Sequence, residues 1–281
     1  MPSNTSDNTW PVGCQLRPWL QTLGTEELAR RLPQVMVQIA EMGFIGFETN
    51  IACLPLAQPR AFRDAAARAN NLILAAAHTG GRWWDPANEA TLPSVVAMAK
   101  RLPDLGCQRL ALSMTRTPTA AYVKHAALTL AYLGKACRQE AGVKVVFHNH
   151  AAELEEDARV LQAIVEECAP ENVALGPDLG WVAHAGVDVV EFIERFGSRI
   201  DYVHVRDVTA YGSNGGFIEI GRGVLDHAAI LAALRSHGYR GWLMAESEFG
   251  LAWRGALDPL ASAALQFAGL RTHCARVPAY P

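Results

Sequence analysis

The sequence predicts an α/β protein folded as a single (β/α)8 TIM barrel. Short strand-like segments alternate with longer segments in which apolar residues recur every three or four positions. The alternation occurs eight times, at about 30 residues for each strand and helix, which fits a closed parallel barrel better than an open sheet. The chain has 281 residues, 50% of them hydrophobic, and this is enough for one such domain.

Eight short apolar runs are the expected strands. In order along the chain they are residues 12–16 (VGCQL), 44–48 (FIGFE), 72–77 (LILAAA), 109–113 (RLALS), 143–148 (VKVVFH), 173–176 (VALG), 200–206 (IDYVHVR) and 242–246 (WLMAE). Eight segments with helical periodicity stand between and after them: residues 25–42, 60–70, 88–102, 119–140, 156–168, 188–196, 226–237 and 257–271. Glycines that each follow a helix and precede a strand predict left-handed helix caps at Gly43, Gly106, Gly142 and Gly238.

The ends and the composition of the chain predict its setting. Residues 1–10 are expected to form a disordered N-terminal tail, and residues 11–281 a single barrel domain. The polar N-terminus lacks the features of a secretory signal, and no apolar run reaches membrane-spanning length, so a soluble cytoplasmic protein is expected. The six cysteines form no CxxC pair, which favours reduced thiols. A net charge of −3 argues against nucleic acid or a membrane surface as partner.

Ionisable residues collect at the ends of the expected strands. In a (β/α)8 barrel, the chemistry is built from the C-terminal ends of the strands and the loops after them. The side chains found there are Glu48, His78, His148, His150, Asp178, His204, Arg206, Asp207 and Glu246. Imidazoles and carboxylates together are typical ligands of a divalent cation, and a cation would allow these carboxylates to be buried near one another. The sequence therefore predicts a metal site in the barrel mouth.

Five segments resemble successive motifs of the xylose isomerase-like barrel superfamily. They are VVFHNHAAELE (145–155), GPDLGWVAHAGVD (176–188), IDYVHVRDV (200–208), EIGRGVLD (219–226) and GWLMAESE (241–248). The resemblance implies one divalent metal ion, manganese, cobalt, magnesium, zinc or iron, held by Asp178, His204 and Glu246. The strand-five position departs from the usual Glu, so His148 is the expected fourth ligand and Glu153 the alternative.

The same resemblance assigns roles around the metal. Glu246 is the expected base, with Glu153 or His150 as its counterpart. Substrate contacts are expected from five residues: Glu48, His78, Trp181, Arg206 and Arg222. Ordinary structural roles compete with these: Glu48 could pair with an outer helix, Arg222 could be a solvated surface residue, and His148 could be a core histidine. Asp207 alternates with His204 and Arg206 along its strand, so it should point toward the helices.

The resemblance implies an isomerase or epimerase that acts on a small polyhydroxylated keto-sugar through an enediolate. A dehydratase or other lyase of a keto-inositol or 3-keto sugar shares this intermediate, and His148 in place of a Glu favours that alternative. A non-catalytic sugar-binding barrel is a further alternative. The endonuclease branch is disfavoured, because Trp181 stands where that branch has a zinc-binding His. Such barrels often form homo-oligomers, and the sequence defines no interface.

Overall fold

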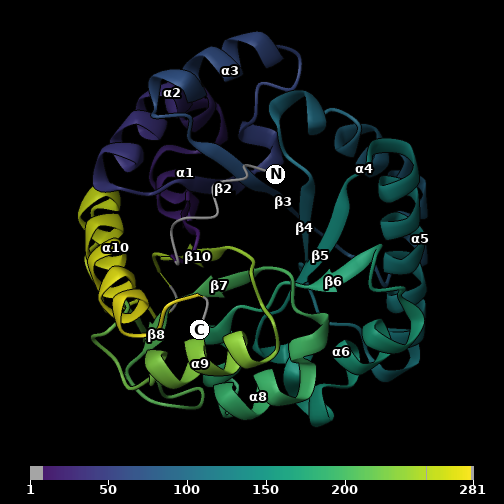
Figure 1. Cartoon of the computed structure of the whole chain (residues 1–281). Helices are drawn as coiled ribbons and strands as arrows, with labels where there is room; N and C mark the ends of the chain where they lie inside the picture. The colour runs from purple at the N-terminus through teal and green to yellow at the C-terminus, as the bar shows by residue number, and fades with distance from the viewer. Residues whose placement is uncertain (1–8, 251, 280–281) are drawn as a thin grey trace.

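The computed structural model describes residues 9–250 and 252–279. Its parallel strands form one curled sheet with helices around it, which confirms the predicted α/β barrel (Figure 1). In chain order the strands of this sheet are β1 (Val12–Gln15), β2 (Gly46–Asn50), β3 (Ile73–Gly81), β4 (Arg109–Met114), β5 (Lys144–His148), β6 (Val173–Leu175), β7 (Val203–Val205) and β10 (Leu243–Ala245). Their order in the sheet is β6-β5-β4-β3-β2-β1-β10-β7.

The barrel closes between β6 and β7, where the pairing is sparse. Two isolated parallel bridges, Leu175 with Ile200 and Asp178 with His204, join the two ends of the sheet. The backbone N–H of Asp201 donates to the Leu175 carbonyl (3.0 Å), and that of His204 donates to the Pro177 carbonyl (2.9 Å). We call this junction the seam.

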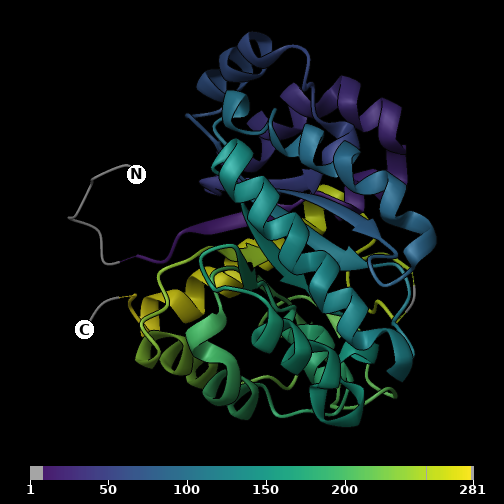
Figure 2. The ribbon, with the colours of Figure 1, turned by 90° about the vertical axis from the view of Figure 1, so that its right-hand side faces the viewer.

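The eight expected helices are present around the sheet, and Figure 2 shows several of them layered outside the strands. They are α2 (Thr25–Met42), α3 (Pro59–Arg68), α4 (Leu92–Ala99), α5 (Val123–Ala141), α6 (Glu155–Glu167), α8 (Val189–Phe196), α9 (His227–Ser236) and α10 (Pro259–Arg276). The four predicted glycine caps all have positive φ; at Gly43, for example, φ is 106° and the residue ends α2 in the left-handed region.

Several short elements were not predicted. They are α1 (Arg17–Leu23), α7 (Leu179–His184), the antiparallel pair β8 (Asp207–Val208) and β9 (Phe217–Ile218), and the 3-10 turns η1 (Ile51–Cys53), η2 (Pro86–Thr91), η3 (Pro103–Leu105), η4 (Ala120–Tyr122), η5 (Ala151–Leu154) and η6 (Gly197–Arg199). The expected strand at 200–206 is shorter, because Asp207 leaves the barrel to pair with Ile218. Periodicity needs more residues than these segments contain.

The barrel interior is filled in layers that set the direction of the site residues. Val146, Tyr202 and Met244 are buried in one apolar cluster. Each stands two residues before a site residue, His148, His204 or Glu246, within a strand or directly at its end. Since side chains two apart on a strand share a face, the site residues point inward above this packed layer.

The structure also bears on the expected N-terminal tail, the cysteines and the expected absence of membrane-spanning segments. Residues 1–8 of the expected tail lie outside the described residues, but Trp10, also placed in that tail, is buried and its indole N–H donates to the Val277 carbonyl (2.7 Å). Trp10 thus belongs to the packed structure. All six cysteines are free thiols. Within the described residues, no helix has the length and apolar character needed to cross a membrane.

Candidate active site

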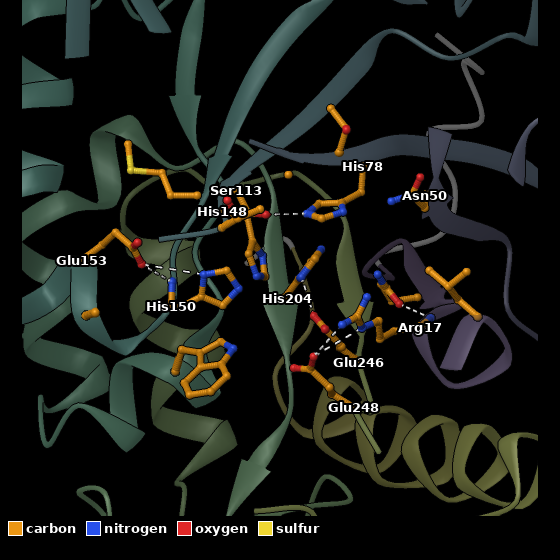
Figure 3. Close-up of a pocket in the computed structure, with 18 of the residues that line it drawn as sticks. Arg17, Asn50, His78, Ser113, His148, His150, Glu153, His204, Glu246 and Glu248 are labelled. Carbon is orange, nitrogen blue, oxygen red and sulfur yellow. Dashed lines mark hydrogen bonds and ion pairs between the residues drawn. The ribbon is translucent and has the colours of Figure 1, made fainter. Parts of the chain in front are cut away.

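A cavity of about 700 Å³ opens at the carboxyl ends of the barrel strands. Figure 3 shows that its side chains converge from opposite sides of the barrel. The ionisable and polar side chains that line it include Gln15, Arg17, Asn50, His78, Ser113, Arg116, His148, His150, Glu153, His204, Glu246 and Glu248. A wall with this many hydrogen-bonding groups suits a polyhydroxylated ligand better than an apolar one.

Four of the predicted ligands lie together, and three of them, His148, His204 and Glu246, line this cavity. One ligand atom from each of His148, Asp178, His204 and Glu246 lies within 4.8 Å of the others, and all four residues are buried. We call them the metal group. They come from β5, the loop after β6, β7 and the end of β10, so four separate segments are needed to build it. This buried His-Asp-His-Glu group could hold a metal ion.

His204 lies between two buried carboxylates, one of which belongs to the metal group. Its Nε2 lies 2.9 Å from the Glu48 carboxylate, and its Nδ1 lies 2.6 Å from Oε2 of Glu246. Burial alone would lower the pKa of His204, but these two carboxylates raise it well above its ordinary value. Glu246 is affected in the opposite sense: burial would raise its pKa, and Arg206 and His204 hold it well below its ordinary value.

The other two members of the metal group are dominated by burial. Burial raises the pKa of Asp178 to about 6, although the Arg206 guanidinium opposes this. Asp178 also begins α7, because its Oδ1 accepts the backbone N–H of Trp181 (3.0 Å). Burial lowers the pKa of His148 well below its ordinary value, with His204 adding to the effect. His148 is therefore a neutral imidazole, the form in which histidine binds a metal.

Arg206 lies beneath the metal group and joins its carboxylates. Its Nη2 pairs with Oδ2 of Asp178 and lies 2.9 Å from Oε1 of Glu246. Its guanidinium also lies over the ring of Phe217, 4.6 Å from the ring centroid. The side chain is fully buried, so these carboxylates and the ring take the place of water.

The donor atoms and the charges both fit a divalent cation. Nδ1 of His148 is buried and has no hydrogen-bond partner among the described residues. With neutral imidazoles, the buried carboxylates of Glu48, Asp178 and Glu246 outnumber the single buried Arg206 by two charges. One divalent cation would balance them, and mixed imidazole and carboxylate donors suit such a cation.

The expected substrate contacts divide into two sets. His78 and Trp181 line the cavity, and Nε2 of His78 lies 3.0 Å from the Ser113 hydroxyl (Figure 3). Glu48 and Arg206 do not line it, since both are fully buried behind the metal group. Both side chains are held there by partners within the group itself, namely His204 for Glu48, and Asp178 and Glu246 for Arg206.

Arg222 lies at the surface, which is the alternative that the sequence analysis kept open for it. Its side chain is 56% exposed and pairs with Glu219 at 3.1 Å, and the residue is not part of the cavity wall. The loop that carries it is fastened to Asp207, which accepts the backbone N–H groups of Gly221 (3.0 Å), Gly223 (3.0 Å) and Leu225 (3.1 Å). Asp207 points away from the cavity, as the strand alternation predicts.

Glu153 and His150 lie beside the metal group rather than in it. Oε2 of Glu153 accepts the backbone N–H of His150 (2.7 Å), and Oε1 accepts the hydroxyl of Thr117 (3.0 Å). With both oxygens engaged, Glu153 orders the turn after β5, and it does not belong to the metal group. The His150 ring is part of the cavity wall, 5.6 Å from the Trp181 ring centroid.

Several cavity residues escaped the sequence analysis. Arg17 pairs with Glu248 (3.2 Å), and both line the cavity (Figure 3). Ser113 ends an expected strand, and Glu248 lies two residues beyond the end of another, at Glu246. The rule that strand ends build the site points to both neighbourhoods, but a serine hydroxyl is a weak signal for a metal site and Glu248 lies past the expected strand end.

A parallel barrel with a buried His-Asp-His-Glu group that could hold a metal ion at its mouth indicates the class of barrel enzymes. Residues 36–266 match the xylose isomerase-like TIM barrel family, and the chain belongs to this family. This confirms the resemblance drawn from the five motifs.

Curated and structural relatives agree with this assignment. An inosose dehydratase from Geobacillus kaustophilus is 34% identical over 126 residues, 39% of this chain and 41% of the relative, so the match spans about two fifths of that protein. A xylose isomerase-like TIM barrel protein from Mycobacterium smegmatis, solved with magnesium, has a TM-score of 0.74 at 16% identity and covers 96% of this chain and 98% of that one. An L-ribulose 3-epimerase has a TM-score of 0.68 at 21% identity, with 95% and 96% covered. The two solved structures show a shared fold.

Proposed function

We propose that the protein is a divalent-metal-dependent enzyme that removes a proton next to the carbonyl group of a small polyhydroxylated keto compound. The observation that carries this proposal is the buried metal group at the floor of a polar cavity. Four ionisable side chains from separate segments lie close enough to share one ion. With neutral imidazoles, the buried carboxylates of Glu48, Asp178 and Glu246 exceed Arg206 by two negative charges, which one divalent ion would balance. The cavity above them is lined by hydroxyl, amide and imidazole groups that can hold substrate hydroxyls.

His148, Asp178, His204 and Glu246 would hold the ion. A divalent cation bound there would polarise a substrate carbonyl and so acidify the neighbouring C–H bond. Glu246 is the proposed base, because its carboxylate lines the cavity beside the proposed metal position. His150 lies across the cavity from Glu246 and is the proposed partner that returns or accepts a proton (Figure 3). Glu153 fixes the backbone of His150.

The fate of the enediolate decides the reaction. A proton returned to the neighbouring carbon, or to the opposite face of the same carbon, gives an isomerase or epimerase, and groups on opposite sides of the cavity support this outcome. Loss of a β-hydroxyl instead gives a dehydratase. The similarity to an inosose dehydratase supports this second candidate. Both candidates begin with the same proton removal.

The test follows that first proton. The protein is freed of metal with a chelator, then given Mn²⁺, Co²⁺, Mg²⁺ or Zn²⁺ with ketohexoses and keto-inositols in D₂O. We expect the NMR signal of the proton next to the carbonyl to disappear only with metal. Asp178→Ala and His204→Ala should reduce the exchange rate by about 100-fold or more, since metal polarisation is worth several kcal/mol.

Product analysis separates the two candidates. A new sugar isomer without loss of water supports the isomerase or epimerase, whereas an ultraviolet-absorbing unsaturated product supports the dehydratase. Protein that binds none of the four metals and exchanges no substrate proton would refute the proposed function.

A further inference from the structure

We propose that Glu48 is a positioning residue for the metal group. Hydrogen bonds that run from Arg17 through Gln15 and Glu48 to His204 all point in one direction. They keep the hydrogen of His204 on Nε2, so that Nδ1 is free to bind a metal ion. The inference rests on the proposed function. Glu48 does not reach the cavity, so its role is carried through His204.

The backbone N–H of Arg17 sets the direction of this series of hydrogen bonds at the end farthest from His204. The N–H of Arg17 donates to Oε1 of Gln15. A backbone N–H can only donate, so the Gln15 amide must present its oxygen to Arg17 and its NH₂ group to the other side. On that side Nε2 of Gln15 donates to Oε1 of Glu48 (3.4 Å). Gln15 and Glu48 are direct neighbours in the pairing of β1 with β2, which places the two side chains on one inner face.

The inner end of the chain is His204. Oε2 of Glu48 lies 2.9 Å from Nε2 of His204, and both side chains are buried. An ionised carboxylate can only accept, so Nε2 carries the hydrogen. Nδ1 is therefore the nitrogen that faces the metal group, where it pairs with Oε2 of Glu246 at 2.6 Å in the metal-free structure. A bound cation would take the place of the proton on Nδ1 and meet its lone pair, while Nε2 keeps its hydrogen for Glu48. A carboxylate behind a metal-binding histidine fixes both its tautomer and its ring orientation.

The pairing of β2 with β3 determines that the Glu48 side chain points toward Nε2 of His204. The pairing of β2 with β3 shifts register between Phe47 and Glu48, where the extra residue Ala75 stands on β3. Such an irregularity re-aims the side chains beside it. Glu48 is thus directed to the buried nitrogen of His204.

The test first changes which groups donate and accept along this series of hydrogen bonds, and a second substitution then restores the original direction. In Glu48→Gln, the side-chain amide must either donate to Nε2 of His204 or turn its NH₂ group against that of Gln15. We expect Mn²⁺ affinity, measured by calorimetry, to fall about 10–100-fold. In the double variant Gln15→Glu/Glu48→Gln, the carboxylate at position 15 accepts from Arg17 and from the amide at position 48, whose oxygen accepts from His204. The double variant has the wild-type charge and should regain most of the affinity.

Controls separate position from folding. Glu219 is equally buried but lies outside the metal group, so Glu219→Gln should leave the Mn²⁺ affinity unchanged. Thermal unfolding of the metal-free variants checks their fold. If Glu48→Gln alone does not fold, the double variant is compared with wild type: near-equal affinity supports the inference and a large loss refutes it.

The remaining outcomes are also decisive. Wild-type affinity in Glu48→Gln, or a double variant as weak as the single one, refutes the inference while leaving the proposed function in place. A wild-type protein that binds no metal refutes both.

Discussion

Arg206 is a fully buried cation that pairs with two proposed metal ligands, Asp178 and Glu246, and at 3.6 Å with Glu248. Two ionised carboxylates cannot lie in a buried group at low cost without a positive charge near them. In the metal-free protein, Arg206 supplies that charge together with His204, whose pKa is raised well above its ordinary value. Arg206 therefore stabilises the metal group when no metal is bound.

Replacing Arg206 should expose this dependence. Arg206→Met leaves the carboxylates of Asp178 and Glu246 uncompensated, and we expect the free energy of unfolding of the metal-free protein to fall by about 3–5 kcal/mol. Saturating Mn²⁺ should recover part of the loss, because the cation replaces the missing charge. Urea unfolding with and without Mn²⁺ measures both values.

Arg199 offers a matched control. The Arg199 guanidinium is partly buried, and it donates to the backbone carbonyls of Val165, Cys168 and Val173 rather than to carboxylates. Arg199→Met should lose stability without responding to Mn²⁺. Equal losses for Arg206→Met in the presence and absence of metal would contradict the role given to Arg206.

The sequence was enough to identify site residues at strand ends, but it could not show whether each side chain lines the cavity or is buried behind it. The rule that strand ends build the site found His148, Asp178, His204 and Glu246, which the structure brings together. It could not tell a residue that lines the cavity from one behind it. Glu48 and Arg206 lie behind it because their long side chains reach inner partners from neighbouring strands, and such partners depend on the register between strands.

At the scale of elements, Asp207 fastens the loop between β9 and α9. Its carboxylate accepts backbone N–H groups from Val208, Gly221, Gly223 and Leu225, and it lies 3.2 Å from Nε2 of His227. Burial would raise the pKa of Asp207, but the contacts with His227 and the N–H groups outweigh it and lower the pKa below its ordinary value. The ionised form is thus the one that holds the loop.

This gives a pH dependence with a definite sign. Because the folded pKa of Asp207 is lower than the unfolded value near 4, its contribution is complete above that value and is lost as the pH falls through the folded pKa. Asp207→Asn removes the charge, and we expect a loss of about 2–3 kcal/mol at pH 7. The difference between wild type and variant should shrink as the pH falls below 4, as urea unfolding at several pH values can show.

Asp258→Asn is the comparison for this prediction. Asp258 accepts a single backbone N–H, from Ala261 at the start of α10, where Asn is an equally good cap. Its replacement should change stability little at any of these pH values. A wild-type to Asp207→Asn difference that is constant from pH 7 to pH 3 would show that the charge of Asp207 has no part in holding the loop.

Long elements were predictable and short ones were not. The expected helix at 25–42 coincides with α2, whose buried face repeats at Leu28, Leu32, Val35 and Ile39. By contrast, α7 has six residues and begins only because Asp178 caps it. The β8–β9 pair exists because the strand ending at Val205 is redirected by Asp207, a tertiary effect without a local signal.

At the scale of the whole molecule, the seam between β6 and β7 coincides with the metal group. One of its two bridges joins Asp178 to His204, and both are proposed ligands. The regular alternation of strands and helices predicted a closed barrel, but it could not predict where closure is weakest. That depends on how far each strand extends in three dimensions.

Metal should therefore protect the seam against opening. At Mn²⁺ concentrations 100 times the Kd, a site lost on opening gains about 2.7 kcal/mol, so the amides of Asp201 and His204 should exchange about 100-fold more slowly. The amide of Ile73, which donates to Ile45 between β2 and β3 on the opposite side of the barrel, is the internal control. Hydrogen exchange read by NMR compares the three. Equal effects at Ile73 and at the seam would indicate general stabilisation.

The charge excess of the buried carboxylates also has a consequence for which ions the protein accepts. A monovalent ion such as K⁺ would leave one negative charge buried and uncompensated, and a trivalent ion would leave one positive charge in excess. Either remainder is costly among buried side chains. The proposed metal group would thus select an ion by its valence as well as by its radius and preferred geometry.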